Sequence, residues 1–442
     1  MSQKGRTTTL EERIEIGERW EAGQTDPEIA TALGYSIWVV RKWRRRYQRH
    51  GRAGLGSRMG RPATGALGHF PEEVQDAIRE MREAHPGWGP DTIQVEWQKD
   101  PTLGGLPQPS RSRIAAFLKQ ENYTRLYERH TEPPQPKKKK VQQVHEEWEM
   151  DAQGVINVAP VGQVSIINII DVRSRLKVES YPCVGTSHPS MKYYQLILRR
   201  AFSHYGLPQR ISLDHDSAFY DNASPSPFPT RFHLWLIALG IQVRFIEDPP
   251  PTEHSLIERT HQTLYQQAVA GQTFTDRHAL QQRLTERRHF LNHDFPTSAL
   301  QGRAPLEAYP EAAHSGKLYR LEWEEAVLNL ERVWAYLAQG RWFRRCSSQG
   351  QFSLGGQRYN AGKDFARQQL EITFNSQTQE LACRTANAEQ ELFFPIRGLT
   401  KADLMGELNP LLTLPEYQLS LPFTPETWRE MILCDDLTGT TL

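Results

Sequence analysis

Three widely spaced carboxylates are the residues of this sequence whose types and positions could do chemistry. Asp151 lies in or at the end of an expected strand, Asp214 follows the expected strand 210–213, and Glu258 stands one turn into an expected helix. Strand ends and a helix can bring distant carboxylates into one cluster, whose oxygen ligands suit Mg²⁺ or Mn²⁺ better than zinc. Two such ions would activate an oxygen nucleophile and stabilise the leaving oxygen of a phosphodiester.

Other ligand-type side chains have plainer interpretations. Asp171 follows an apolar strand and precedes two arginines, which favours a structural ion pair or a strand-end cap. Glu253 is five residues before Glu258, about 500° around a helix, so the two carboxylates diverge and only Glu258 is chosen as a ligand. His254, Glu258 and His261 share a helix face, but a zinc site would need a further strong ligand nearby.

The elements around these carboxylates alternate between strands and helices. From residue 145 onward the apolar segments VGQVSIINIID, RLKVESYPC and IQVRFI read as strands, and helices are expected over about 187–205 and 230–239. Hydrophobic strands that alternate with helices imply a sheet covered on both faces. The middle of the chain is therefore predicted to be an α/β domain.

The first 70 residues carry a basic excess, with thirteen Lys and Arg against seven Asp and Glu. Helices are expected over 10–22, from Asp26-Pro27-Glu28 to Leu33, and after Ser36, with Gly34 permitting a tight turn. The third helix has a basic side, and this order is typical of a helix-turn-helix that reads a DNA major groove. A solvated basic face is the alternative. The basic side consists of Arg41, Lys42, Arg44, Arg45 and Arg46.

A second, weaker helix-turn-helix pattern follows, with an amphipathic helix over 71–84 and a Ser110-capped helix that carries Arg111 and Arg113. Its alternative is a purely structural helical spacer. The Pro-then-Lys tract 131–143 cannot pack a core and indicates an extended linker.

Composition excludes several classes of protein. The 442 residues have a net charge of only +1, 38% hydrophobic residues and a mean hydropathy of −0.63. No apolar run is long enough for a membrane span, and the N-terminus has no secretory core. The four cysteines form no CxxC pair, so neither a disulfide framework nor a zinc ribbon is indicated. We therefore expect a cytoplasmic protein with no membrane partner, in which a basic head is balanced by an acidic tail.

Four segments in order resemble the core of one known family. WEMD at 148–151, IIDVRSR at 169–175, ISLDHDSAF at 211–219 and HSLIERTH at 254–261 are similar to bacterial insertion-sequence DDE transposases of the retroviral integrase superfamily. The resemblance covers about 145–310. It implies an RNase H-like fold in which Asp151, Asp214 and Glu258 are the catalytic residues and the ligands of Mg²⁺, with Mn²⁺ as a substitute.

The sequence departs from the family pattern at several points. The usual Asp-Asn-Gly is Asp214-His215-Asp216 here, which makes Asp216 a rival ligand. Forty-three residues separate Asp214 from Glu258, against roughly 35 in the family, and the excess is assigned to the loop 221–230. His254 replaces a common Asn, and Tyr265 replaces a usual basic residue. No carboxylate of the triad is lost.

The expected fold class is multidomain: helical helix-turn-helix domains, an α/β RNase H-like core, and a small antiparallel β-barrel that carries further arginines. The expected boundaries are 1–62 for the first helix-turn-helix domain, 66–128 for the second, 129–144 for a basic linker, 145–310 for the core, 320–398 for the barrel and 399–442 for an acidic tail.

The resemblance implies a DNA transposase that binds the ends of a mobile element, frees 3′-OH ends and joins them to target DNA. Its partners would be double-stranded DNA, namely the terminal repeats and the target, and further copies of itself on DNA, at the bacterial nucleoid. The tail is interpreted as a docking segment, for which an accessory ATPase is the candidate partner. A domesticated non-catalytic DNA-binding protein and a metal-dependent nuclease are the alternatives. His261 is expected at DNA phosphates, and the DNA contacts are assigned to Arg41, Lys42, Arg44, Arg45, Arg46, Arg111, Arg113 and Arg259.

Overall fold

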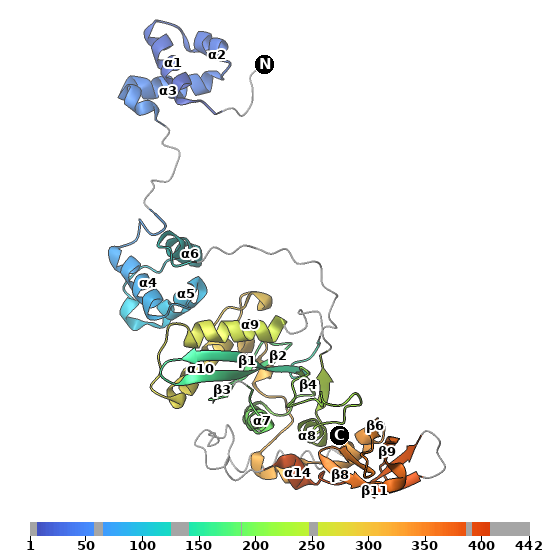
Figure 1. Ribbon diagram of the computed structural model, residues 1–442. Coiled ribbons are helices and arrows are strands. Elements are labelled where there is room, and N and C mark those ends of the chain that lie inside the picture. The colour runs from blue at the N-terminus through green and yellow to red at the C-terminus, as the bar shows by residue number, and fades with distance from the viewer. Residues whose placement is uncertain are drawn as a thin grey trace. The chain divides into compact units, whose positions relative to one another are not determined.

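The computed structural model divides into two compact units, residues 1–71 and 72–442, and each is described by itself (Figure 1). The expected domains from 66 onward thus fall largely within one unit. The structure describes residues 7–56, 65–124, 141–186, 188–246, 255–385 and 391–406.

Three short helices form the first unit, in the order predicted for a helix-turn-helix: α1 (Leu10–Glu21), α2 (Asp26–Leu33) and α3 (Ile37–His50). Thr25 rather than Asp26 is the N-cap of α2, because its backbone and hydroxyl groups both pair with Glu28. Gly34 ends α2 in the left-handed region, at a φ of 71°, as the predicted tight turn requires. The buried core comprises Ile16, Ile29, Ala30, Val40, Trp43, Tyr47 and Leu55.

The second unit begins with three more helices, as the second pattern predicts. Their bounds are α4 (Glu72–Ala84), α5 (Pro90–Lys99) and α6 (Arg111–Gln120). Buried apolar residues along α4 and α6, such as Ile78 and Phe117, show why the amphipathic pattern forms helices here. No helix in the ranges described above is both long and apolar enough to cross a membrane.

Five strands form the central mixed sheet, in the spatial order β3-β2-β1-β4-β5. β1, β2 and β3 form an antiparallel meander, and β4 and β5 run parallel to β1. This order, with these directions, is the RNase H-like arrangement that the resemblance implies. The strands are β1 (Glu147–Val158), β2 (Gly162–Asp171), β3 (Lys177–Val184), β4 (Arg210–Leu213) and β5 (Gln242–Phe245).

Helices cover both faces of this sheet, as the alternating pattern predicts. α9 and α10 lie over one face, and α7 and α8 lie over the other (Figure 1). β2 is buried along its last eight residues, which explains its near-continuous apolar sequence. Asn168 is a fully buried amide within that strand. The helices are α7 (Met191–Tyr205), α8 (Arg231–Ala238), α9 (Ser255–Leu264) and α10 (Arg277–His293).

The C-terminal strands are antiparallel, as predicted, but the described strands do not close into one hydrogen-bonded barrel. They form a four-stranded sheet, β11-β10-β9-β6, and a separate hairpin of β7 with β8. Phe352, Tyr359 and Phe394 pack the hairpin onto the sheet through their rings, so a small core forms without a closed ring of strands. The strands are β6 (Arg341–Arg345), β7 (Gln351–Leu354), β8 (Gln357–Asn360), β9 (Gln369–Asn375), β10 (Glu380–Thr385) and β11 (Glu391–Pro395).

The C-terminal sheets share one hydrophobic core with the central sheet. Trp334 of α13 stacks near Phe374 of β9 while its helix contacts α8. The start of the expected tail also belongs to this unit, because α14 packs against α8. The remaining tail, 407–442, with its predicted ATPase-docking role, lies outside the described residues. The connecting helices are α11 (Pro305–Ala308), α12 (Glu324–Val327), α13 (Leu330–Leu337) and α14 (Lys401–Met405).

A buried ion pair ties these connecting helices to the core. Both Arg199 on α7 and Glu324 on α12 are essentially inaccessible to solvent, and the guanidinium donates two hydrogen bonds of 2.7 Å to the carboxylate. The Trp235 indole and the Tyr319 hydroxyl donate to the same carboxylate. Three chain segments, namely α7, α8 and residues 319–324, thus meet at one charged group.

Replacing Glu324 by Ala should destabilise the second unit by about 3–5 kcal/mol, because Arg199 would remain buried without its partner. Chemical denaturation of the full chain measures this change. Glu325→Ala is the matched control, since the neighbouring side chain is exposed and its loss should cost less than about 0.5 kcal/mol. Equal stability of the two variants would contradict the structural role of the pair.

Candidate active site and nucleic-acid interface

Two of the three predicted carboxylates lie on neighbouring parallel strands. β1 and β4 pair with Glu149 opposite Ser212, so continuation of the same register sets Asp151 opposite Asp214, just beyond the end of β4. Paired positions in parallel strands project to the same face, and neighbouring strands are about 4.8 Å apart. The register therefore brings Asp151 and Asp214 together, as the sequence predicts. Both side chains are partly exposed.

Glu258 lies in the first turn of α9, the helix that packs against β1 and β2. Ile257, Thr260 and Leu264 form the buried side of this helix, which fixes its rotation and leaves Glu258 exposed at its edge. The preceding segment, 247–254, lies outside the described residues, and with it Glu253 and His254. The helix thus carries the third carboxylate over the face of the sheet that holds the other two.

His261 connects α9 directly to Asp151, a contact that the sequence, which assigned this residue to DNA phosphates, did not predict. The imidazole is 8% exposed, and its Nε2 lies 3.2 Å from Oδ2 of Asp151. Its Nδ1 lies 2.7 Å from the amide nitrogen of Asn168. A buried ring in this position holds two parts of the site together.

A row of polar side chains determines which ring nitrogen of His261 carries the proton. Asp151, Asn168 and Ser180 are direct cross-strand neighbours on β1, β2 and β3. The Ser180 hydroxyl donates to Oδ1 of Asn168 at 2.6 Å, so the Asn168 amide nitrogen faces His261 and donates to its Nδ1. Nε2 of His261 then carries the proton and donates a hydrogen bond to Asp151. The only sequence signal for this row is a lone Asn within an apolar strand.

Three nearby aspartates act electrostatically on the hydroxyl of Tyr194 on α7. Burial raises the pKa of this phenol, and the carboxylates of Asp216, Asp151 and Asp214 raise it further. The three aspartates therefore all lie within electrostatic range of one hydroxyl. We call the neighbourhood of Asp151, Asp214 and Asp216 the acidic region, since it offers the carboxylates that a cation site for a phosphodiester reaction would need.

The aspartates that follow β4 and the aspartate that ends β2 have different hydrogen-bond partners. The two carboxylates after β4 cap their own loop: Asp214 accepts from the backbone of Asp216, and Asp216 accepts from that of Ala218. Asp171, in contrast, accepts from the backbones of His145 and Ser174, and from the Ser174 hydroxyl. Asp171 is therefore the strand-end cap that the sequence favours, whereas Asp216 stays within the acidic region as a rival ligand.

A divalent cation fits the chemistry of these donors, because Asp151, Asp214 and Glu258 offer hard oxygen ligands. Across the described ranges, no three His, Cys, Asp or Glu side chains stand at the spacing of a ready-made metal site. One Asp151 oxygen already accepts from His261. The residues thus suit a cation in kind, and a cation would have to draw the carboxylates closer together.

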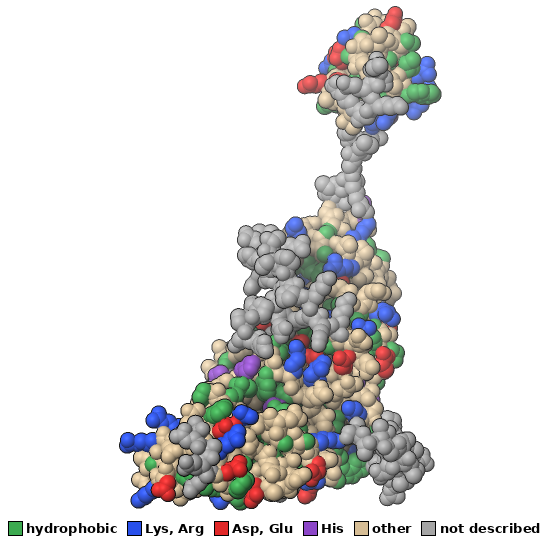
Figure 2. All heavy atoms as spheres, turned by 90° about the vertical axis from the view of Figure 1, so that its right-hand side faces the viewer, with side chains coloured by type: hydrophobic (Ala, Val, Ile, Leu, Met, Phe, Trp, Pro, Cys, Tyr) green, Lys and Arg blue, Asp and Glu red, His purple; other side chains and the backbone are tan. Residues whose placement is uncertain are grey.

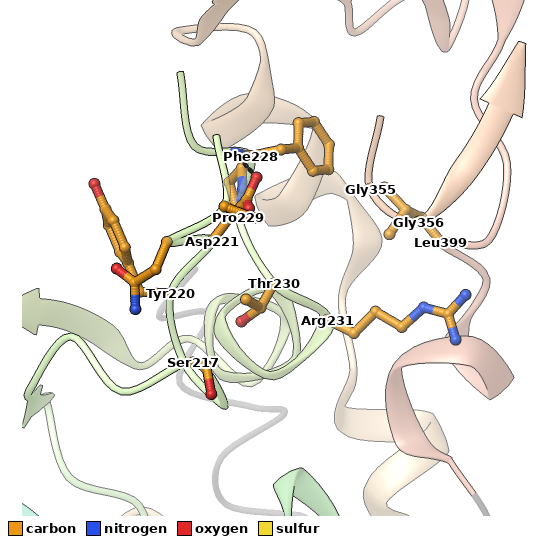
Figure 3. A pocket seen from close by; sticks show the side chains of 12 residues that line it. Ser217, Tyr220, Asp221, Phe228, Pro229, Thr230, Arg231, Gly355, Gly356 and Leu399 are labelled. Carbon is orange, nitrogen blue, oxygen red and sulfur yellow. Dashed lines mark hydrogen bonds between the residues drawn. The ribbon is translucent and has the colours of Figure 1, made fainter. Parts of the chain in front are cut away.

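A cavity of about 600 Å³ borders the loop that follows Asp216. Figure 3 shows Ser217, Tyr220 and Arg231 on its core side, with Gly355 and Leu399 of the C-terminal part opposite. None of the three predicted catalytic carboxylates lines it. The cavity is a neighbour of the acidic region and not its centre.

The third helix of the first unit presents the basic face expected of a reading helix. Arg41, Lys42 and Arg45 are exposed, and Trp38 joins them on the same side with 77% of its side chain accessible. Figure 2 shows Lys and Arg side chains on the surface of this unit. Spacings of three and four residues place these side chains in one stripe. The exposed Trp38 was not predicted.

Several of the arginines predicted to contact DNA through this helix also make contacts within the first unit. Asp26 of α2 pairs with Arg44 at 2.8 Å and with Arg41 at 3.3 Å. The Arg46 guanidinium lies 5.0 Å from the Trp43 ring, so it is partly turned inward. Arg44 and Arg46 are half-buried. They therefore support the helix as well as adding positive charge.

The remaining predicted contacts lie in the second unit. Arg111 pairs with Asp91 at 2.9 Å and stays more than half exposed. Arg113 is half-buried, and Arg259 is exposed on α9 next to Glu258. Arg259 thus lies beside the acidic region, whereas the other two lie on α6.

Two homeodomain-like domain models match the N-terminal part of the chain. One covers residues 7–56, which hold α1 to α3, and the other covers residues 39–131, which extend through α6. Homeodomain-like helix-turn-helix regions in front of an RNase H-like core fit an integrase-superfamily transposase, and this layout supports a DNA-processing role.

Solved structures with some similarity come from retroviral integrases. An intasome of simian T-cell lymphotropic virus, in complex with a PP2A regulatory subunit, has a TM-score of 0.33 and 12% identity, covering 72% of this chain and 96% of that chain. The HTLV-2 integrase catalytic core domain in complex with magnesium, in its trimeric form, has a TM-score of 0.28 and 14% identity, covering 37% and 96%. The RNase H-like assignment here rests on the strand order.

Replacing His261 by Ala should lower DNA strand transfer by about 10- to 100-fold, the usual cost of losing a group that orients a metal ligand. Binding of DNA should be unchanged, because His261 is buried. His261→Gln should recover part of the activity, since its amide can still donate to Asp151. A gel assay of strand transfer beside a DNA-binding titration measures both. Full activity of His261→Ala would show that this contact does not matter.

Proposed function

We propose that the chain is the DNA transposase of a mobile element, which binds the element ends, frees their 3′-OH groups and joins them to target DNA. The observation that carries the proposal is the register of β1 with β4, whose continuation puts Asp151 opposite Asp214, on the sheet against which α9 with Glu258 packs. The helix-turn-helix regions supply the DNA-binding part.

In this proposal Asp151, Asp214 and Glu258 hold Mg²⁺, with Mn²⁺ as a substitute. The bound ions would make water, and later the 3′-OH, a better nucleophile and would stabilise the leaving oxygen. The protein contributes placement: β1 and β4 fix two carboxylates, and α9 fixes the third. His261 holds Asp151 through its Nε2 proton. Catalysis is then positioning plus charge stabilisation, without a covalent protein intermediate.

The partners in this proposal are the terminal repeats of the element, the target DNA and further copies of the chain. The exposed stripe on α3 would read the repeats in the major groove. Arg259, exposed beside Glu258, would contact phosphates close to the reacting one. Joining two ends in one event requires at least two active sites, so the working form is a multimer assembled on DNA.

The experiment is a strand-transfer assay with pre-cleaved element ends, a supercoiled target plasmid and Mg²⁺ or Mn²⁺. Metal-dependent joined products are expected, and EDTA should remove them. Cleaved but unjoined DNA would indicate a metal-dependent nuclease. Specific end binding without any DNA chemistry would indicate a domesticated, non-catalytic protein.

A further inference from the structure

The second helical module (α4 to α6) is mounted on the same side of the core as the helix of Glu258. It contacts the short π-helical segment η3 (Tyr265–Val269) and α10. The Gln267 amide donates to the Thr92 hydroxyl at 2.7 Å, and the Gln272 amide donates to the Ala84 carbonyl at 2.7 Å. A side chain of α5 and the backbone at the end of α4 thus meet the core in defined pairs.

A buried arginine bridges the two parts. Arg287 of α10 is 5% exposed and donates to Glu96 of α5 at 2.6 Å and to Gln267 of η3 at 2.7 Å. Its guanidinium also lies 3.9 Å from the Phe290 ring centroid and 4.9 Å from that of Trp88. Burying a charge costs several kcal/mol unless its partners are well placed. The bridge therefore requires one particular docking geometry.

This junction lies on the same continuous helix as Glu258. η3 follows α9 without a break, and Gln267 is nine residues after Glu258, roughly 13 Å along the axis. π-helical turns are uncommon and occur often at functional sites. A helix this short moves as one body, so a displacement at Gln267 also displaces Glu258.

The backbones of the two parts touch at Gly87. A Cβ built on Gly87 would overlap the carbonyl oxygen of Gln266, whereas a Cβ on Gly89, two residues later, would meet open space. Ala at position 87 must therefore displace the loop of Gly87, η3 or both. Gly87→Ala thus introduces a local steric clash, and Gly89→Ala is its matched control.

We propose that the helical module is a positioning element of the active site: its docking through Gly87, Thr92 and Glu96 onto Gln266, Gln267 and Arg287 sets where α9 holds Glu258. The proposal rests on the proposed transposase function. It assigns the module a role in the chemistry in addition to DNA contact through α6. Neither Gln267 nor Arg287 touches the reacting groups in this account, so both are positioning residues.

The test compares full-length Gly87→Ala, Gly89→Ala and Thr92→Val with the parent chain. Gly87→Ala should lower the strand-transfer rate about tenfold, in the range seen when supporting groups of a metal site are lost. It should raise the Mg²⁺ concentration needed for half-maximal rate and speed amide hydrogen exchange across α9. Affinity for element-end DNA should stay within about twofold, because α3 lies in the first unit and the substitution removes no basic side chain from α6. Thr92→Val should shift rate and exchange in the same direction by less, and Gly89→Ala should match the parent.

The inference is wrong if Gly87→Ala and Thr92→Val lose only end affinity while rate at saturating DNA, Mg²⁺ requirement and α9 exchange match the parent. It is also wrong if Gly87→Ala lowers thermal stability alone. A parent chain that joins no ends with either metal would overturn the proposed function instead. In that case accelerated exchange of α9 in Gly87→Ala would still show the mechanical coupling.

Discussion

Replacing Glu258 by Gln is expected to lower strand transfer by on the order of 10³-fold while end binding stays unchanged, since charge stabilisation is commonly the largest catalytic term. The substitution keeps the size of the side chain and removes only its charge. Glu258 is exposed at the edge of α9, so the fold should not be affected. The measurement is the rate of joining pre-cleaved ends at saturating DNA and Mg²⁺.

Asp151→Asn and Asp214→Asn should be equally inactive, because the register of β1 with β4 makes the two carboxylates neighbours that would share the same cations. Asp216→Asn is the informative comparison, since its carboxylate lies in the same acidic region. It should keep most of the activity. An inactive Asp216→Asn beside an active Asp214→Asn would mean that the cation uses the second aspartate of the loop.

The second large effect is expected in the reading helix. Lys42→Ala with Arg45→Ala should weaken binding to element ends and reduce the slope of log K against log salt by about two, one for each lost phosphate contact. Trp38→Ala should weaken binding to the end sequence without changing that slope, because it removes apolar contact and no charge. Fluorescence anisotropy at several salt concentrations separates the two effects.

Arg19→Ala is the matched control for this series, since Arg19 lies on α1 and pairs with Glu15. It should leave both affinity and slope unchanged. If none of the α3 variants weakens end binding, the first unit is not the principal reader. Variants of Arg111 and Arg113 on α6 would then be the next to measure.

The positions of the carboxylates could be predicted because local patterns decide them. The apolar run of β2 and the strand before Asp214 are evident in the sequence, and the caps at Ser36 and Gly34 mark their helix ends. Strand order follows from the family resemblance. Local patterns therefore predict which element carries each carboxylate and roughly where that element ends.

The contacts between distant segments could not be predicted in the same way. His261 shares a helix with exposed Arg259, and only the packing of α9 on β2 shows that its ring faces Asn168. Arg287 resembles one more basic residue of α10 until Glu96, 191 positions away, is placed beside it. The closure of the C-terminal strands depends likewise on which edges pair, which residue spacing does not determine.

The central claim is that Asp151, Asp214 and Glu258 hold the cations that act on DNA. Its most direct test is anomalous X-ray scattering from Mn²⁺ in crystals of the full chain bound to a pre-cleaved element end. We expect anomalous peaks bounded by these three carboxylates and next to the 3′ end. Mn²⁺ bound elsewhere, or no peak in an end complex that joins DNA in Mn²⁺, would contradict it.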